Sequence, residues 1–365
     1  SARFVSSACG TPGKRVALRA GSGEGLRPAC AARLVCNGEK EEEMAEQNGG
    51  GKAALVGASL AAIAAGAGYG TGGAVCQIVA GFGFDIGHIV VIEFLVGALV
   101  LGVLSCTKYR TWPTGKELVQ LIGLGLASCF SSLCYFFAID LLSVGQAVAV
   151  QFQYVWIAVL IQSVVERTRP GKWVVISTLA IIAGTLLGSG LVDEMLSSGS
   201  GLALDPLGFA LAIGCAVVYG AYLYLNGRIA PRVPPVTRGF FIAVGGAIMA
   251  AAFAPGFFRG DCDIVALLPG GIAMGLIMCV IPLACLSQAA KRLPGGIVAI
   301  LTSTELPVAV LAGCLMLGEK ATPLTILGVV IITASIVLSE MDSLVRKKPG
   351  EDGAADAQAP VLGSR

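Results

Sequence analysis

Long apolar runs separated by short polar segments follow one another from about residue 53 to residue 341. A helix needs about 20 apolar residues to cross a bilayer, and these runs are close to that length. The pattern therefore predicts an all-α integral membrane protein. Its ten transmembrane helices are expected over 53–79, 87–105, 117–139, 143–165, 172–190, 207–227, 238–258, 267–290, 294–317 and 323–341.

One polar segment occurs twice, each time between two apolar runs. Glu-Arg-Thr-Arg-Pro at 166–170 recurs as Glu-Lys-Ala-Thr-Pro at 319–323, a spacing of 153 residues. The recurrence predicts a first repeat over 53–190 and a second over 203–341, with five helices in each. Because five is odd, the second repeat must enter the membrane in the opposite orientation. Inverted repeats of this kind are common among secondary transporters.

Positive charges are distributed unevenly between the predicted loops. The loops at 106–116, 166–172, 228–238 and 291–293 together hold eleven Lys and Arg residues. The alternate loops hold two, Arg259 and Lys320, and no Lys or Arg falls in the interior of a predicted span. The positive-inside rule places the richer loops, and with them both termini, in the cytoplasm. The expected location is the plasma membrane, which in a bacterium is the inner membrane.

Composition supports the membrane assignment. Hydrophobic residues make up 55% of the chain and charged residues 13%, against about 25% charged in soluble domains. The mean hydropathy is +0.82. A net charge of +2 argues against a nucleic-acid partner.

The two ends of the chain lack long apolar runs. Residues 1–52 contain several arginines and an acidic cluster from Glu39 to Glu43, and the first Met is Met44. Three interpretations stay open: sequence upstream of the native start, a disordered cytoplasmic tail, or an Arg-rich organellar transit peptide. The polar segment 342–365, rich in Gly, Ala and Asp, is expected to be a disordered cytoplasmic tail.

Three short motifs in the second repeat carry a family likeness. They read LTSTELPV at 301–308, LGEK at 317–320 and PLTILG at 323–328. With them the chain resembles the EamA-like family of the drug/metabolite transporter superfamily. The resemblance covers 53–341 and implies a ten-helix carrier with two-fold pseudosymmetry and a central pathway. Carriers of very different substrates share these motifs, so they say little about the cargo.

The chain departs from the family pattern at two positions. Many relatives carry Arg early in helix two, where this chain has Glu93 within Val-Ile-Glu-Phe. Many also carry Pro in helix four, where this chain has Tyr154, the position that aligns with Pro307. The first change swaps the sign of a membrane charge. The second is expected to remove a kink from one half only.

Two acids within the predicted spans are the first candidates for chemistry. Glu305 lies mid-helix beside Thr302 and Ser303, and Pro307 is expected to free the carbonyl near Ser303 because proline cannot donate a hydrogen bond. A carboxylate at that depth faces a cavity or is protonated. Glu305 is therefore a candidate proton or cation coupling site, and the alternative is a structural carboxylate bonded to a neighbouring helix. Glu93 either lines the pathway or reaches water or a polar neighbour near the outer third of its helix.

Helix four is unusually polar. Gln146 and Gln153 are seven residues apart and share one face, whereas Gln151 and Tyr154, three apart, share another. One face is expected to meet the cavity, where amides can bind a polar substrate. The alternative for these side chains is hydrogen bonding between helices.

Two tyrosines occupy matching places in the repeats. Tyr69 in helix one and Tyr219 in helix six stand beside Gly70 and Gly220. They can gate the pathway or stack on cargo, although core packing is the preferred interpretation.

Motifs for bound cofactors are weak. The stretch at 66–73 contains G-x-G-x-x-G, but it lies inside a membrane helix, so close helix packing explains it better than dinucleotide binding. The chain has twelve Cys without a C-x-x-C motif, and one His. No cofactor and no metal site are predicted.

These features together predict a class of function. A dianionic cargo needs cations in the pathway, and none is predicted there. The expected protein is a secondary active transporter of a small neutral, zwitterionic or cationic metabolite or drug, such as an amino acid or an amine. Proton-coupled export by alternating access is expected, with the bilayer, the cargo and protons as partners and a monomer or homodimer as the assembly.

Two other classes of function stay open. A non-transporting scaffold or receptor can keep the carrier fold. An intramembrane enzyme would need a nucleophile and base or paired catalytic Asp residues, and neither a G-x-S-x-G motif nor such a pair is found. The chain is therefore not predicted to be an enzyme.

Overall fold

The structure, a computed structural model, describes residues 28–109, 111–142, 144–198 and 205–345. The chain divides into two compact units, Ser1–Gly51 and Lys52–Arg365. Each unit is described by itself.

In the first unit, residues 28–51 are helical and begin α1 (Pro28–Gly81). Disorder was one of the three interpretations left open for the N-terminal segment, and the choice among them stays a prediction. Ala and Glu are frequent in this stretch and favour helix. Residues 1–27 of that segment, and 346–365 of the expected C-terminal tail, lie outside the described residues.

In the second unit every element of secondary structure among the described residues is a helix. After α1, the first repeat forms α2 (Ile86–Lys108), α3 (Gly115–Leu141), α4 (Val144–Gln151), α5 (Tyr154–Glu166) and α6 (Lys172–Gly188). The connection 191–206 contains a short helix, α7 (Leu191–Ser198). The second repeat forms α8 (Pro206–Asn226), α9 (Pro235–Phe253), α10 (Gly256–Arg259), α11 (Ile264–Met274), η1 (Gly275–Val280), α12 (Ile281–Ala289), α13 (Gly295–Thr302), α14 (Glu305–Ala312), η2 (Gly313–Leu317) and α15 (Pro323–Val345).

Eight helical stretches in the described residues are long and apolar enough to cross a membrane. They coincide with eight of the ten predicted spans. The other two predicted spans are helices as well, but their apolar parts, Lys172–Gly188 and Pro323–Ser339, are shorter. A 17-residue helix rises roughly 25 Å, less than the ~30 Å of a hydrocarbon core. Helix length alone therefore supports eight spans and leaves the count of ten unconfirmed.

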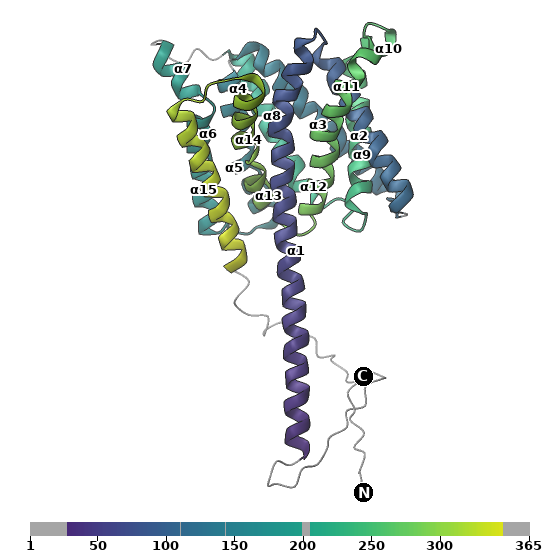
Figure 1. The fold of residues 1–365 in the computed structure, drawn as a ribbon, viewed down its shortest axis with the longest axis vertical. Coiled ribbons are helices and arrows are strands. Elements are labelled where there is room, and N and C mark those ends of the chain that lie inside the picture. The colour runs from purple at the N-terminus through teal and green to yellow at the C-terminus, as the bar shows by residue number, and fades with distance from the viewer. Residues whose placement is uncertain (1–27, 110, 143, 199–204, 346–365) are drawn as a thin grey trace, which may run out of the picture. The chain divides into compact units, whose positions relative to one another are not determined.

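The helices of the two repeats pack in matching pairs. Figure 1 shows α6 and α15 side by side at one edge of the bundle, with α2 and α9 at the opposite edge. Helix six, α8, packs against α3 and α5, which are helices three and four. The stretch 66–72 of helix one packs against η1, α13 and α14, which belong to helices eight and nine. These are the contacts that two-fold pseudosymmetry between the repeats requires.

Loops from the two repeats meet at each end of the bundle. At one end, called here the Arg232 end, Arg232 binds Glu117 with two hydrogen bonds of 3.0 and 3.1 Å, and Arg228 pairs with Glu166. The loops that meet there are the ones rich in Lys and Arg. At the other end, called the Asp85 end, Thr322 donates to Asp193 across 2.5 Å.

Glycines bring α3 and α9 into backbone contact. A Cβ at Gly125 would lie 2.9 Å from both the Gly245 Cα and the Gly246 nitrogen. A Cβ at Gly123, two residues earlier on α3, would meet nothing within 4 Å. Small residues permit this close approach in membrane bundles, where dispersion and packing drive association.

Candidate functional site

Two predicted spans are broken in mid-helix, at nearly equivalent places. Helix four divides into α4 and α5 at residues 152–153, and helix nine into α13 and α14 at residues 303–304. In each break a backbone N–H bonds the carbonyl three residues back instead of four. Gln153 donates to Val150 at 3.1 Å, and Ser303 donates to Ile300 at 3.2 Å.

In each break a polar side chain donates a hydrogen bond to the carbonyl that has lost its backbone partner. The Gln153 Nε2 donates to the Ala149 carbonyl at 2.9 Å, and the Ser303 Oγ donates to the Ala299 carbonyl at 3.1 Å. Irregular backbone at membrane depth needs such partners because lipid offers none. Gln153 and Ser303 thus stabilise the breaks.

The prediction for helix four was wrong in one respect. A kink was expected in one half only, because Tyr154 stands where Pro307 stands in the other half. Helix four breaks without proline, since the Gln153 side chain supplies the bond that the backbone gives up. The Ser303 carbonyl, expected to be free, accepts from the Leu306 N–H at 3.2 Å.

Removing either polar side chain is expected to weaken its break. Gln153→Ala and Ser303→Ala should each lower the free energy of unfolding by about 0.6 kcal/mol and at most about 1.7 kcal/mol, the range of such bonds in membranes. The double variant is expected to depart from additivity, because Tyr154, next to Gln153, interacts with the Ser303 side chain and α5 packs against α13. Unfolding in mixed micelles measures this, and an additive loss would mean that the breaks are not coupled.

A cavity of about 310 Å³ lies beside the two breaks. It extends from mid-bundle toward the Asp85 end, because Ala80, Ile86, Ile139 and Val148 line it close to the loops of that end. None of the described residues that line it is Lys, Arg or His. Its polar lining comes from six helices and comprises Tyr69, Cys76, Gln77, Glu93, Ser128, Ser131, Ser132, Tyr135, Gln151, Cys215, Tyr219 and Glu305.

The cavity brings together part of the set predicted from the sequence. Five of those residues line it: Tyr69, Glu93, Gln151, Tyr219 and Glu305. The others are not among the described lining residues: Gln146, Gln153, Tyr154, Thr302, Ser303 and Pro307. Thr302 is fully buried and donates to the Val298 carbonyl at 2.7 Å.

Tyr154 does not follow Gln151 to the cavity, although the helical spacing predicted a common face. The helix breaks between them, so the register on which that prediction depends is lost. Tyr154 is fully buried, with its ring 4.8 Å from that of Tyr219 in an edge-to-face arrangement.

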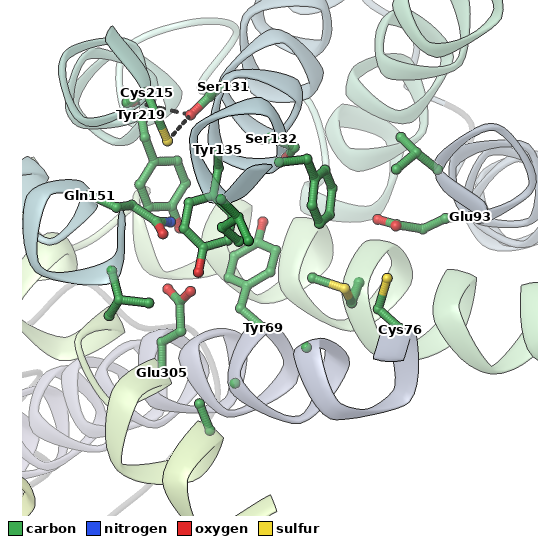
Figure 2. Close-up of a pocket in the computed structure, with 18 of the residues that line it drawn as sticks. Tyr69, Cys76, Glu93, Ser131, Ser132, Tyr135, Gln151, Cys215, Tyr219 and Glu305 are labelled. Atoms are coloured by element: carbon green, nitrogen blue, oxygen red, sulfur yellow. Dashed lines mark hydrogen bonds between the residues drawn. The ribbon is translucent and has the colours of Figure 1, made fainter. Parts of the chain in front are cut away.

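Glu305 is the first residue of α14 and lies among tyrosine hydroxyls. Figure 2 shows its carboxylate pointing toward Tyr135 and Gln151 across the cavity. Tyr69, Tyr135, Tyr154 and Tyr219 are all close enough to interact electrostatically with it. Within the described part of the chain Glu305 forms no ion pair. The surroundings therefore offer hydroxyl donors to an ionised carboxylate without neutralising it.

Glu93 lies on the other side of the cavity from Glu305 (Figure 2). It is the eighth residue of α2 and is 8% exposed. It interacts electrostatically with Tyr69 and with the thiols of Cys76, Cys129 and Cys279. It too has no ion pair among the described residues. Thiols are weak hydrogen-bond donors, so Glu93 has poorer partners than Glu305.

Sequence reasoning missed the contribution of α3. Ser128, Ser131, Ser132 and Tyr135 form a polar stripe on the cavity side of this helix. Ser131 also donates to the Cys215 carbonyl at 3.1 Å, which joins α3 to α8. Spacings of three, four and seven residues put these side chains on one helical face. That periodicity was a usable signal in the sequence.

The Gly-rich stretch of α1 serves helix packing, as predicted. A Cβ at Gly68 would lie 2.7 Å from the Ile277 carbonyl oxygen, and one at Gly70 would lie 2.9 Å from the Ala309 nitrogen. Gly70 also abuts the backbone of Glu305. These glycines seat α1 against the helices that carry the cavity.

Comparison with known proteins identifies the family. The model of the EamA-like transporter family matches residues 56–190 and 206–341. The chain belongs to the EamA-like transporter family. It is a multi-pass membrane transporter, and its partners are the bilayer and a small-molecule substrate.

Individual relatives are more distant. The threonine/homoserine exporter RhtA of Salmonella typhimurium (strain SL1344) is 25% identical over 261 residues, 71% of this chain and 82% of the relative. RhtA of Escherichia coli (strain K12) is 24% identical over 249 residues, 67% of this chain and 79% of the relative. A solved crystal structure covering 80% of this chain and 99% of its own matches with a TM-score of 0.65 at 18% identity, which shows a common fold.

One finding about this EamA-like transporter corrects the charge analysis. Arg238 lies in the first turn of α9, inside a span, and is fully buried. The sequence analysis took 238 as the boundary of that span, whereas the helix begins at Pro235 and carries the guanidinium inward. Arg238 does not line the cavity.

Proposed function

We propose that this protein is a proton-coupled exporter of a small neutral, zwitterionic or cationic metabolite. The observation that carries the proposal is Glu305, an acid without an ion pair at a helix break, facing a cavity with no described cation in its lining. The relatives named threonine/homoserine exporter support export and make an amino acid the first cargo to test.

The cavity suits a small molecule with an amino group. Its volume of about 310 Å³ is at the lower end of the range for ligand sites. Glu305 and Glu93 would attract an ammonium group, and the hydroxyls of α3 with Gln151 would bond polar atoms. Phe94 and Phe136 supply apolar wall.

The topology that this function requires is ten spans in two inverted repeats. We infer that α6 and α15 cross the membrane despite their length, since a short helix is accommodated by local thinning of the bilayer. The Lys- and Arg-rich loops put the Arg232 end, and both termini, in the cytoplasm of a plasma or bacterial inner membrane. The cavity then faces outward in the present conformation. A monomer or a homodimer is the proposed assembly.

Coupling would come from competition for Glu305. The ammonium group of the cargo and a proton can each neutralise the carboxylate. Binding of one would therefore exclude binding of the other. Exchange of the two across the membrane follows if both ligated forms reorient more readily than the empty one. The breaks in helices four and nine are the places where the two halves of each helix can change angle.

Flux into proteoliposomes tests the proposal. Purified protein is given an imposed pH gradient and separate pools of amino acids, polyamines, nucleobases and lipophilic cations. One class of compound is expected to move in the direction opposite to the protons, and the amino-acid pool is the first to test. Flux that ignores the pH gradient would overturn proton coupling. Absence of any flux by folded protein would favour the scaffold or receptor alternative.

A further inference from the structure

Arg238 is a buried cation without a counter-charge. Its Nη2 donates to the Asn226 Oδ1 at 2.9 Å, and its Nη1 donates to the Ser287 carbonyl at 3.2 Å. Both acceptors are neutral, and within the described residues no carboxylate pairs with it. Burying a charge without a paired anion is costly, so this arrangement calls for an explanation.

The groups around Arg238 have an excess of donors. The Arg238 Nε and the Asn226 Nδ2 are buried without a hydrogen-bond partner in the described structure. The hydroxyls of Tyr222, Thr237 and Ser287 are in the same condition. Buried polar groups are normally satisfied, and each of these five can donate. The cluster formed by these five residues, called here the Arg238 cluster, therefore has unused donors. Its three hydroxyls can also accept, but a hydroxyl does not neutralise the guanidinium, so the charge of the cluster favours an anion as the acceptor.

The Arg238 cluster continues the cavity toward the Arg232 end. Asn226 follows the cavity residue Tyr219 by seven positions on α8, and Ser287 follows the cavity residue Leu283 by four positions on α12. Both spacings keep a residue on the same helical face. Tyr222 connects the two regions, because its ring stacks on that of Tyr219 at 5.9 Å. The same faces of α8 and α12 thus line the cavity and, farther along, carry residues of the cluster, where both helices contact Arg238 on α9.

We propose that Arg238, with Asn226, is a second cargo site that binds a carboxylate when the Arg232 end opens. The inference rests on the proposed export function and narrows its cargo to molecules that carry a carboxylate, as zwitterionic amino acids do. A guanidinium binds a carboxylate through two parallel hydrogen bonds, which are about twice as strong as bonds to neutral acceptors. A cargo carboxylate would therefore displace the Asn226 and Ser287 oxygens that hold Arg238 in the closed conformation.

The site also gives the pathway a direction. Cargo entering from the Arg232 end would meet a cation first and the acids Glu305 and Glu93 afterwards. A zwitterion would bind Arg238 through its carboxylate and then the acids of the cavity through its ammonium group. An amine without a carboxylate would find partners only in the cavity.

Equilibrium binding to purified protein in detergent tests the site without a proton gradient. The probes are radiolabelled L-threonine and 1-aminopropan-2-ol, which is threonine without its carboxylate. Arg238→Gln is expected to weaken threonine binding about tenfold or more, as loss of a charged hydrogen-bonding partner does, and to leave amine binding nearly unchanged. Arg238→Lys should lie between wild type and Arg238→Gln. Arg228→Gln, at an exposed arginine of the same end, is the matched control and should leave the ratio of the two affinities unchanged.

A second variant keeps the test independent of any folding defect in Arg238→Gln. Asn226→Asp nearly preserves shape and supplies an internal carboxylate for Arg238. It is expected to raise the melting temperature and to weaken threonine binding while sparing the amine. Equal loss of both probes in the Arg238 variants, or wild-type protein that binds neither probe, would overturn the carboxylate site. Coupled amino-acid flux with an unchanged threonine-to-amine ratio in Arg238→Gln would overturn this inference and leave the export function standing.

Discussion

Glu305→Gln is expected to abolish pH-driven accumulation of cargo and to weaken, without abolishing, the exchange of cargo for cargo. Glutamine keeps the size and hydrogen-bonding capacity of the side chain but cannot titrate, so binding of cargo no longer competes with binding of a proton. Coupling free energies of about 1–3 kcal/mol correspond to roughly 5- to 150-fold changes in affinity. A loss of that order in gradient-driven accumulation is the expected result.

Two assays on the same proteoliposomes separate coupling from binding. Uptake against an imposed pH gradient reports coupling, and counterflow of labelled against unlabelled cargo at equal pH reports binding and reorientation. Wild-type binding should depend on pH, and Glu305→Gln binding should not. Glu93→Gln is the matched control, because Glu93 lines the same cavity but interacts with three thiols and one tyrosine, whereas Glu305 interacts with four tyrosines. Gradient-driven uptake that survives in Glu305→Gln and disappears in Glu93→Gln would transfer the coupling role to Glu93.

Gly125→Ala is expected to lower the yield and stability of folded protein strongly. The added methyl would lie 2.9 Å from the Gly245 Cα and the Gly246 nitrogen on α9. These are backbone atoms, so the whole helix must move to make room. Overpacking of this kind costs about 1–3 kcal/mol and occasionally more. The expected result is a lower melting temperature and a smaller monodisperse fraction in size-exclusion chromatography.

Gly123→Ala provides the control on the same helix. A Cβ there meets nothing within 4 Å, and replacing Gly by Ala inside a helix favours the helix by up to about 1 kcal/mol. This variant should be as stable as wild type or slightly more stable. If both variants behave alike, the close approach of α3 and α9 does not contribute to stability as the structure suggests.

The acids of the site were visible in the sequence for a simple reason. A polar or ionisable side chain in an apolar run is costly to bury in lipid, so Glu93 and Glu305 stand out without a structure. Serine is common and carries little cost, because it can bond its own helix backbone. The α3 stripe of Ser128, Ser131 and Ser132 was therefore overlooked, although it supplies the hydroxyls opposite the acids.

The failures in helix four have a different cause. Proline is the sequence signal for a helix break, and Pro307 predicted the break in helix nine. In helix four the break depends on a hydrogen bond from the Gln153 side chain to the Ala149 carbonyl. The same side chain could instead bond to a neighbouring helix, so the sequence does not specify the break. Gln153 and Tyr154 were consequently placed on helical faces that the unbroken helix would have had.

By itself, the sequence determined that this chain is a membrane protein of two homologous halves, because hydrophobic length, repeat spacing and loop charge are properties of the linear chain. It also marked Glu305 and Glu93 as exceptional. Only the tertiary structure decided which polar side chains meet in one cavity, and that Arg238 is drawn into the bundle as a cation without an anion. Those outcomes depend on helix breaks and on contacts between residues far apart in sequence, such as Asn226 and Ser287 around Arg238. Periodicity within a single helix does not encode them.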